Sequence, residues 1–202
     1  MRPDAVMRIF EEAGAIRHGH FELTSGLHSG TYVQCAQVLQ YPKYAEQLGR
    51  ALAAEFMDLR VDCVASPALG GLIVGHEVAR AIPARAEGKP MRAIFVERDS
   101  LGTLTLRRGF HVEPDEHVLV VEDVWTTGGS TCETIRVLEE AGARVVAAGA
   151  LIDRSGGGIE LPVRTEALVE LKIENYDPSD CPLCRDGGVA VKPGSRYART
   201  AS

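Results

Sequence analysis

The sequence lacks long apolar stretches and any excess of basic residues. No apolar run approaches the roughly 20 residues that a helix needs to cross a bilayer, so no membrane partner is expected. The formal net charge is −6, from 22 basic and 28 acidic residues, which argues against nucleic acid as a partner because nucleic-acid surfaces gather basic charge. The opening Met1-Arg2-Pro3-Asp4 leads into a charged amphipathic stretch and not a signal peptide, so we expect a cytoplasmic location.

Two common nucleotide-binding loops are also missing. The pattern Gly-x-x-x-x-Gly-Lys-Ser/Thr does not occur, which argues against a P-loop ATPase. No Gly-x-Gly-x-x-Gly follows an apolar strand pattern, which argues against a dinucleotide-binding Rossmann site. Phosphate recognition, if present, must therefore use another loop.

Cysteine is present in an odd number, five. Cys35, Cys63 and Cys132 lie in apolar segments and are interpreted as small core residues, which fits a reducing compartment. The remaining two, Cys181 and Cys184, form a single C-x-x-C pair near the C-terminus.

That pair is not interpreted as a metal site. A structural zinc site usually needs four ligands, commonly from two such pairs, but there is no second pair and no histidine follows Cys184. Two histidines near the proposed site segments, His28 and His111, are interpreted as incidental. The other four show no ligand spacing: His18, His20, His76 and His117.

The length of 202 residues fits one domain, or one with a small appendage. Short apolar runs alternate with helical patterns, which predicts an α/β fold with a central parallel sheet covered by helices on both faces. Strands are expected at residues 61–65, 92–96, 118–121, 145–152 and 167–171, and helices at 6–13, 42–56, 70–81 and 130–141. Residues 1–42 are expected to form an N-terminal cap, with short strands near 21–23 and 32–35, and residues 155–202 to be less regular.

The most informative segment follows the apolar run 118–121. Two acids, Glu122 and Asp123, are expected at the end of that strand, where parallel sheets bind ligands. A loop then leads into a helix at Ser130, through Val124, Trp125, Thr126, Thr127, Gly128 and Gly129. The glycines allow the backbone to approach a ligand, and a helix N-terminus suits a phosphate.

The parts of this segment together predict a cradle for a ribose 5-phosphate. The acids would accept hydrogen bonds from the vicinal hydroxyls of the ribose, and the threonine and serine hydroxyls would donate to phosphate oxygens. Ser130 and Glu133 also match a capping box. The alternative is a solvent-exposed strand, loop and helix with an acidic cap.

Residues 118–130 resemble the phosphoribosyl pyrophosphate (PRPP) signature of type I phosphoribosyltransferases. Three further segments resemble orotate phosphoribosyltransferases in particular: residues 21–29 their early Phe-x-Leu-x-Ser-Gly-x-x-Ser element, residues 67–71 their pyrophosphate turn, and residues 151–154 the strand end whose arginine holds the orotate carboxylate. The resemblance implies the type I fold with an N-terminal hood. It also implies transfer of the phosphoribosyl group from PRPP to orotate in pyrimidine biosynthesis, with Mg²⁺ carried by the pyrophosphate.

The resemblance also implies roles for individual residues. Glu122 and Asp123 would anchor the ribose, residues 124–130 would bind PRPP, and Thr126 and Arg154 would contact orotate. The segment 97–110 would be a lid that enters the partner subunit's site in a homodimer, with Arg98 binding PRPP and Arg107 and Arg108 acting in catalysis.

The sequence departs from the family pattern in its basic residues. Many members have a catalytic lysine in the lid, but this lid has none, so Arg107 or Arg108 would act electrostatically. Thr24 and the Leu69-Gly70 pair also stand where many relatives carry lysine.

Other interpretations of these features stay open. Arg154 could be a surface arginine, and the lid a solvated basic hairpin. The chain could transfer the group to a purine or uracil, or could be a PRPP-sensing regulator that binds nucleic acid.

Overall fold

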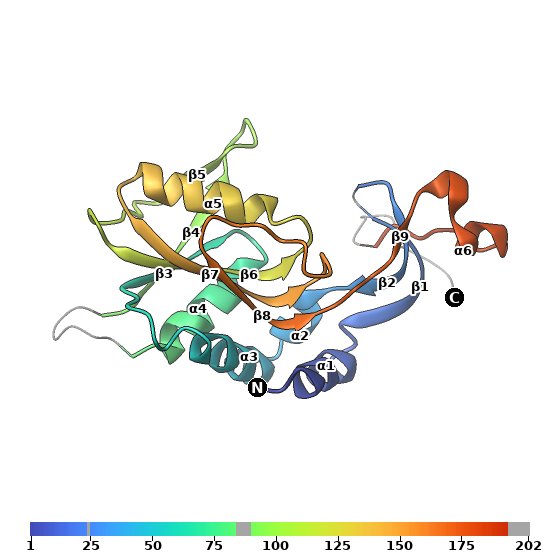
Figure 1. The fold of residues 1–202 in the computed structure, drawn as a ribbon, viewed down its shortest axis with the longest axis horizontal. Coiled ribbons are helices and arrows are strands. Elements are labelled where there is room, and N and C mark those ends of the chain that lie inside the picture. Colours follow the sequence, from blue (N-terminus) through green and yellow to red (C-terminus); the bar gives the residue numbers. More distant parts are fainter. Residues whose placement is uncertain (24, 84–89, 194–202) are drawn as a thin grey trace.

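A six-stranded sheet forms the centre of the computed structural model, which describes residues 1–23, 25–83 and 90–193 (Figure 1). Its strands are β3 (Cys63–Pro67), β4 (Arg92–Arg98), β5 (Leu104–Leu106), β6 (His117–Trp125), β7 (Arg144–Asp153) and β8 (Arg164–Glu170). They lie in the order β5-β4-β3-β6-β7-β8. All neighbours are parallel except β4 and β5, which form an antiparallel hairpin at one edge.

Helices cover both faces of this sheet, as predicted. On one face, α1 (Pro3–Glu12), α3 (Pro42–Ala54) and α4 (Gly71–Ala81) pack in one apolar cluster with Leu119 and Val121 of β6. On the other face, α5 (Gly129–Glu140) packs in a second cluster with Val118 and Val120. Successive residues of a strand point to opposite faces, so a continuous apolar run is what a sheet with two covered faces requires.

A second, smaller sheet stands apart from the central one (Figure 1). It contains β1 (Ile16–Glu22), β2 (His28–Val33) and β9 (Asn175–Tyr176), in the order β1-β2-β9. The 3₁₀ helix η1 (Pro178–Asp180) and the short helix α6 (Pro182–Arg185) follow β9. We call β1, β2, β9 and residues 177–193 the hood. Its third strand comes from the C-terminal segment, whereas α1 and part of the N-terminal region join the central core.

Several predicted boundaries are shifted by a few residues, and two of these differences bear on the site. Cys35 does not end a strand but begins α2 (Cys35–Leu39), because Cys35, Val38 and Leu39 are buried at helical spacing against the core. Strand β6 does not end at residue 121 but continues to Trp125, because Val124 and Trp125 pair with β7. The two acids therefore lie within β6 and not after it.

Among the described residues, none of the helices has both the length and the apolar character that crossing a membrane demands.

Candidate active site

Two linked hydrogen bonds orient the Glu122 carboxylate. The indole Nε1 of Trp125 donates to Thr131 Oγ1 at 2.9 Å, and the Thr131 hydroxyl donates to Glu122 Oε2. Among the described residues no group donates to the other carboxylate oxygen, Oε1. Burial raises the pKa of Glu122 to about 7; the Thr131 hydrogen bond opposes this rise and the neighbouring charge of Asp123 adds to it. The arrangement orients one oxygen and leaves the second for a ligand.

Asp123 faces the turn between β3 and α4. A Cβ on Gly70 would lie 2.8 Å from Asp123 Cγ, and a Cβ on Gly71 would lie 2.8 Å from a side chain of β3. Real Cβ atoms do not approach other atoms so closely. The turn therefore needs glycine at both positions, Gly70 to lie against Asp123 and Gly71 to lie against β3. Burial raises the pKa of Asp123, although hydrogen bonds from the main-chain N–H groups of Asp123 and Val124 oppose the rise. The turn predicted to hold pyrophosphate is thus a neighbour of the acid pair.

The loop after β6 presents the N-terminus of α5. Gly128 is the N-cap residue, with a φ of +73° that favours glycine, and no side chain caps the helix. Thr126, Thr127 and Gly129 are exposed. The first N–H groups of a helix have no intrahelical partner and carry the positive end of its dipole. This terminus can therefore receive a phosphate.

The predicted capping box is wrong. Ser130 lies inside the first turn of α5, two residues past the N-cap position that Gly128 occupies. The Glu133 carboxylate instead accepts a hydrogen bond from Arg98 at 2.9 Å. The N-cap residue Gly128 has no side chain to cap the helix, and the one first-turn N–H with a side-chain acceptor among the described residues is that of Gly129, which donates to Thr127 Oγ1 over a long 3.4 Å.

The side chains of Val124 and Trp125 do not face this loop. Val124 packs against the cluster on the α3 and α4 face, and Trp125 is 2% exposed within the cluster on the α5 face. Val124 and Trp125 can therefore make their predicted contacts with PRPP only through main-chain atoms.

Arg154 lies beside the end of β6. Its main-chain N–H donates to the carbonyl of Trp125 at 2.8 Å. The side-chain Nε is buried and has no hydrogen-bond partner among the described residues. Burial lowers the pKa of Arg154, and nearby Cys35 and Tyr32 oppose this shift. A buried donor without a partner is costly, so the side chain is suited to an anionic ligand and does not behave as a surface arginine.

The predicted lid is the β4–β5 hairpin with the residues that follow it. Its arginines are all paired: Arg108 donates to Glu97 at 2.8 Å, Arg107 lies 3.7 Å from the same carboxylate, and Arg98 donates to Glu133. Strands β4 and β3 separate β5 from β6, a span of about 14 Å at the usual strand spacing. Within one chain, the described structure pairs Arg107 and Arg108 with Glu97 and not with Glu122 or Asp123.

Two residues near the acids were missed from the sequence. Thr131 positions Glu122, but nothing in its spacing distinguishes it from any helical threonine. Cys35 is a core residue as predicted, and its Sγ also lies 3.6 Å from the main-chain oxygen of Asp123. The same prediction is wrong for Cys132, which is exposed on α5. Thr24, which stands where many relatives carry lysine, lies outside the described residues.

We expect Glu122→Gln to stabilise the protein at pH 8 and to do so much less at pH 5. The folded state holds the Glu122 proton up to about pH 7, whereas an ordinary glutamate loses it near 4.5, so stability falls as pH rises between these values. Glutamine avoids this loss and can still accept from Thr131. The gain should be on the order of 2–3 kcal/mol above pH 7, measured by urea unfolding. The exposed Glu139→Gln is the control, and an equal gain at both pH values would contradict the assignment.

Comparison with known proteins places this geometry in a family. A model of the phosphoribosyl transferase domain matches residues 34–181. An orotate phosphoribosyltransferase of Pelotomaculum thermopropionicum is 51% identical over 97% of this chain and 99% of its own length. Another, from Desulforamulus reducens, is 50% identical over 97% and 98%. The crystal structure of the Aeropyrum pernix orotate phosphoribosyltransferase superposes with a TM-score of 0.62 at 27% identity, over 83% of this chain and 94% of that one.

The full-length identity, the matched domain and the site at the ends of β6 and β7 agree with one another. The chain belongs to the orotate phosphoribosyltransferases of the phosphoribosyl transferase family.

Proposed function

We propose that Glu122, Asp123, the α5 N-terminus and Arg154 together carry out transfer of the 5-phosphoribosyl group from PRPP to orotate. The products are orotidine 5'-monophosphate and pyrophosphate, in the biosynthesis of UMP. The observation that carries this assignment is the meeting of three features at the ends of the paired strands β6 and β7. They are an acid pair, a helix terminus without a side-chain cap from its N-cap residue, and an arginine whose buried Nε has no partner among the described residues. Each matches one charged or hydroxylated part of the two substrates.

The roles follow from the charges that the reaction creates. The bond from the ribose C1 to the pyrophosphate oxygen breaks with its electron pair leaving on pyrophosphate. A bond forms from C1 to the orotate ring nitrogen, and the proton of that nitrogen passes to pyrophosphate or water. Positive charge builds on the ribose, so carboxylates at the ribose hydroxyls stabilise it. The α5 terminus with Thr126, Thr127 and Ser130 holds the 5'-phosphate. The guanidinium fork of Arg154 pairs with the orotate carboxylate and holds the ring in line.

Mg²⁺ is part of this proposal as an ion carried mainly by the pyrophosphate and water. Adjacent strand residues point to opposite sides: Glu122 toward Thr131 of α5, and Asp123 toward Gly70. The pair therefore does not form a two-carboxylate clamp for one ion. This fits Mg²⁺, which keeps several waters and commonly binds substrate phosphates. The ion would neutralise charge on the leaving pyrophosphate.

We further propose a homodimer in which the lid of one subunit serves the site of its partner. The position of β5 at the sheet edge, two strands removed from β6, supports this. The guanidinium groups of Arg107 and Arg108 would exchange Glu97 for pyrophosphate oxygens. Arginine binds phosphates well but does not readily give up a proton, so their contribution would be electrostatic.

Mixing two inactive variants tests the shared lid. Arg107→Ala/Arg108→Ala protein and Asp123→Asn protein should each be nearly inactive alone. Equal mixing and subunit exchange should restore about a quarter of wild-type activity, because half of the dimers are mixed and each then has one intact site. Two preparations of the same variant, mixed in the same way, are the control. No recovery after mass spectrometry has established mixed dimers would contradict lid sharing.

The substrate assignment is tested by the loss of orotate absorbance in the presence of PRPP and Mg²⁺. Parallel reactions with adenine, guanine, hypoxanthine and uracil identify a different base. Turnover of one of these bases instead of orotate would reject the orotate assignment. Binding of PRPP by calorimetry with no turnover, together with a gel shift of nucleic acid, would indicate a regulator.

A cytoplasmic location is also proposed. None of the five cysteines forms a disulfide, as is usual for proteins of a reducing compartment. Fractionation of cells that produce the chain would test it.

A further inference from the structure

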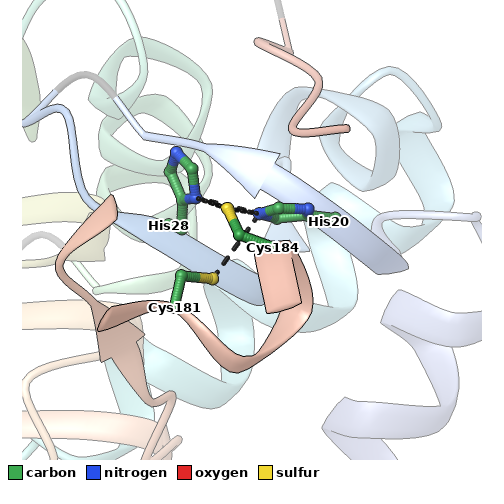
Figure 2. A group of neighbouring side chains, drawn as sticks. All are labelled: His20, His28, Cys181 and Cys184. Carbon is green, nitrogen blue, oxygen red and sulfur yellow. Dashed lines mark hydrogen bonds between the residues drawn. The ribbon is translucent and has the colours of Figure 1, made fainter. Parts of the chain in front are cut away.

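The hood gathers four metal-binding side chains that lie far apart in the sequence. The four side chains point toward one another (Figure 2). They belong to His20 of β1, His28 of β2, Cys181 at the N-cap of α6 and Cys184 within α6. Each offers one ligand atom, and the four atoms all lie within 4.8 Å of one another. From these contacts we infer that the hood contains a structural Zn²⁺ site with a Cys₂His₂ ligand set. This site is separate from the transferase site.

The spacing of the ligand atoms fits a tetrahedral zinc ion. Zinc bonds of about 2.3 Å to sulfur and about 2.0–2.1 Å to nitrogen place a tetrahedral sulfur and nitrogen about 3.6 Å apart. The Nε2 of His20 lies 3.6 Å from Cys181 Sγ and 3.7 Å from Cys184 Sγ, and Cys184 Sγ lies 3.3 Å from Nδ1 of His28. The two nitrogens are 2.9 Å apart. The sulfur-to-nitrogen distances are thus close to those of a tetrahedral site, and all four ligand atoms lie within 4.8 Å of one another.

The second nitrogen of His20 is already paired in the way that metal sites use. Its Nδ1 lies 3.1 Å from the main-chain oxygen of Gly188. A proton on Nδ1 donated to this carbonyl leaves a lone pair on Nε2, the atom that faces both sulfurs, and such carbonyl partners are usual behind histidine ligands of metals. A Cβ on Gly188 would lie 3.1 Å from Nδ1, so glycine allows this close approach.

The local folds hold each pair of ligands before any metal binds. The antiparallel pairing of β1 and β2 brings the two histidines together across a hairpin. Cys181 is the N-cap residue of α6 and Cys184 lies in its first turn, and residues three apart in a helix share one face. Hydrogen bonds between His20 and Val191, and between Glu22 and Val191, fasten the following residues to β1.

The surroundings of the four side chains indicate a structural role for such an ion. Cys181 is 1% exposed and His28 is 9% exposed, yet neither belongs to the two apolar clusters of the central sheet. A sheet as small as β1-β2-β9 has little apolar area of its own to bury, and small units of this kind commonly rely on metals or disulfides. Two thiolates and two neutral imidazoles would also cancel the charge of Zn²⁺, so the buried site would be neutral.

The ligand set favours zinc over the other common metals. Thiolates are soft ligands, and a tetrahedral site of two sulfurs and two nitrogens is typical of Zn²⁺. All four positions are filled by protein, which is typical of structural and not of catalytic zinc. The Mg²⁺ of the transferase reaction would not bind here, because it prefers oxygen ligands.

Metal analysis of the full-length protein, purified without a metal-affinity tag, tests the inference. We expect about one zinc ion per chain. Cys181→Ser/Cys184→Ser and His20→Ala proteins should hold less than about a tenth of that amount. Cys132→Ser and His18→Ala are matched controls, because Cys132 is an exposed cysteine of α5 and His18 is an exposed histidine of the same strand as His20; both should keep the full amount.

Two measurements on the unmodified chain keep the test independent of variants that fail to fold. Titration with a mercurial thiol reagent should release the zinc in proportion to the thiols modified. Replacement of zinc by Co²⁺ should produce a thiolate-to-cobalt absorption band and the intense visible bands of a four-coordinate site. Reduced wild-type protein that holds no zinc and gives no such bands with Co²⁺ would overturn the inference. So would a double cysteine variant that keeps its zinc, and neither result would bear on the transferase activity.

Discussion

Asp123→Asn is expected to lower kcat/KM for PRPP by about two to three orders of magnitude. The change keeps the shape of the side chain and removes only its charge. Asp123 is wedged against Gly70, so asparagine should occupy the same place without repacking. Burial raises the pKa of Asp123, and hydrogen bonds from two main-chain N–H groups oppose that rise by favouring the charged carboxylate, the form that would stabilise positive charge on the ribose. The measurement is the initial rate of orotate loss at varied PRPP concentration.

The matched control for this prediction is Glu140→Gln, which removes an exposed acid near the end of α5. Its kcat/KM should stay within about twofold of wild type, since surface substitutions away from functional features have small effects. The Asp123→Asn protein should be at least as stable as wild type, because it no longer buries a charge whose pKa is raised by burial. An activity within tenfold of wild type in stably folded Asp123→Asn protein would remove Asp123 from the ribose site.

Arg154→Ala should raise the KM for orotate by about 30-fold or more and leave the dissociation constant of PRPP nearly unchanged. Truncating one member of a buried, hydrogen-bonded charge pair costs about 2–5 kcal/mol of binding free energy. In the Arg154→Ala protein, the bound orotate carboxylate would have lost its charged partner. In the unliganded protein the Arg154 Nε has no partner among the described residues. Its removal should therefore cost little folding stability, which separates a binding role from a structural one. Steady-state kinetics and calorimetry of PRPP measure the two constants.

Two further variants sharpen the role of Arg154. Arg154→Lys keeps the positive charge but loses the two-pronged geometry, so its KM for orotate should lie between those of wild type and Arg154→Ala. Arg136→Ala removes an exposed arginine of α5 and should leave the KM unchanged. If Arg154→Ala weakens PRPP and orotate equally, the side chain shapes the site as a whole and does not recognise the carboxylate.

Several parts of the fold were predictable because their causes are local. A continuous apolar run predicts a strand buried on both faces, and residues 118–121 are that strand. The Gly128 position after it takes the left-handed backbone that glycine favours. The capping box failed for a local reason as well. Ser130 is the second residue of the helix that Gly128 caps, and residue type alone does not place a helix boundary to within one or two residues.

Local sequence patterns did not predict the contacts between distant segments. The partnership of Glu122 with Thr131, and the pKa of about 7 that burial produces, depend on how α5 packs on β6. The pairing of Arg107 and Arg108 with Glu97 depends on the hairpin that β4 and β5 form. These contacts follow from tertiary packing, which residue spacing does not encode.

The sequence by itself determined the family, the parallel sheet and the acid-and-glycine segment of the transferase site, because each is written in consecutive residues. Only the tertiary structure decided that Arg154 has a buried donor without a partner in the described part of the chain, and that His20 and Cys181, 161 positions apart, lie in contact. Ligand spacing in a sequence reveals a metal site only when one local element carries most of its ligands. Here a hairpin and a short helix each supply two, and the pairing of β2 with β9 brings them together.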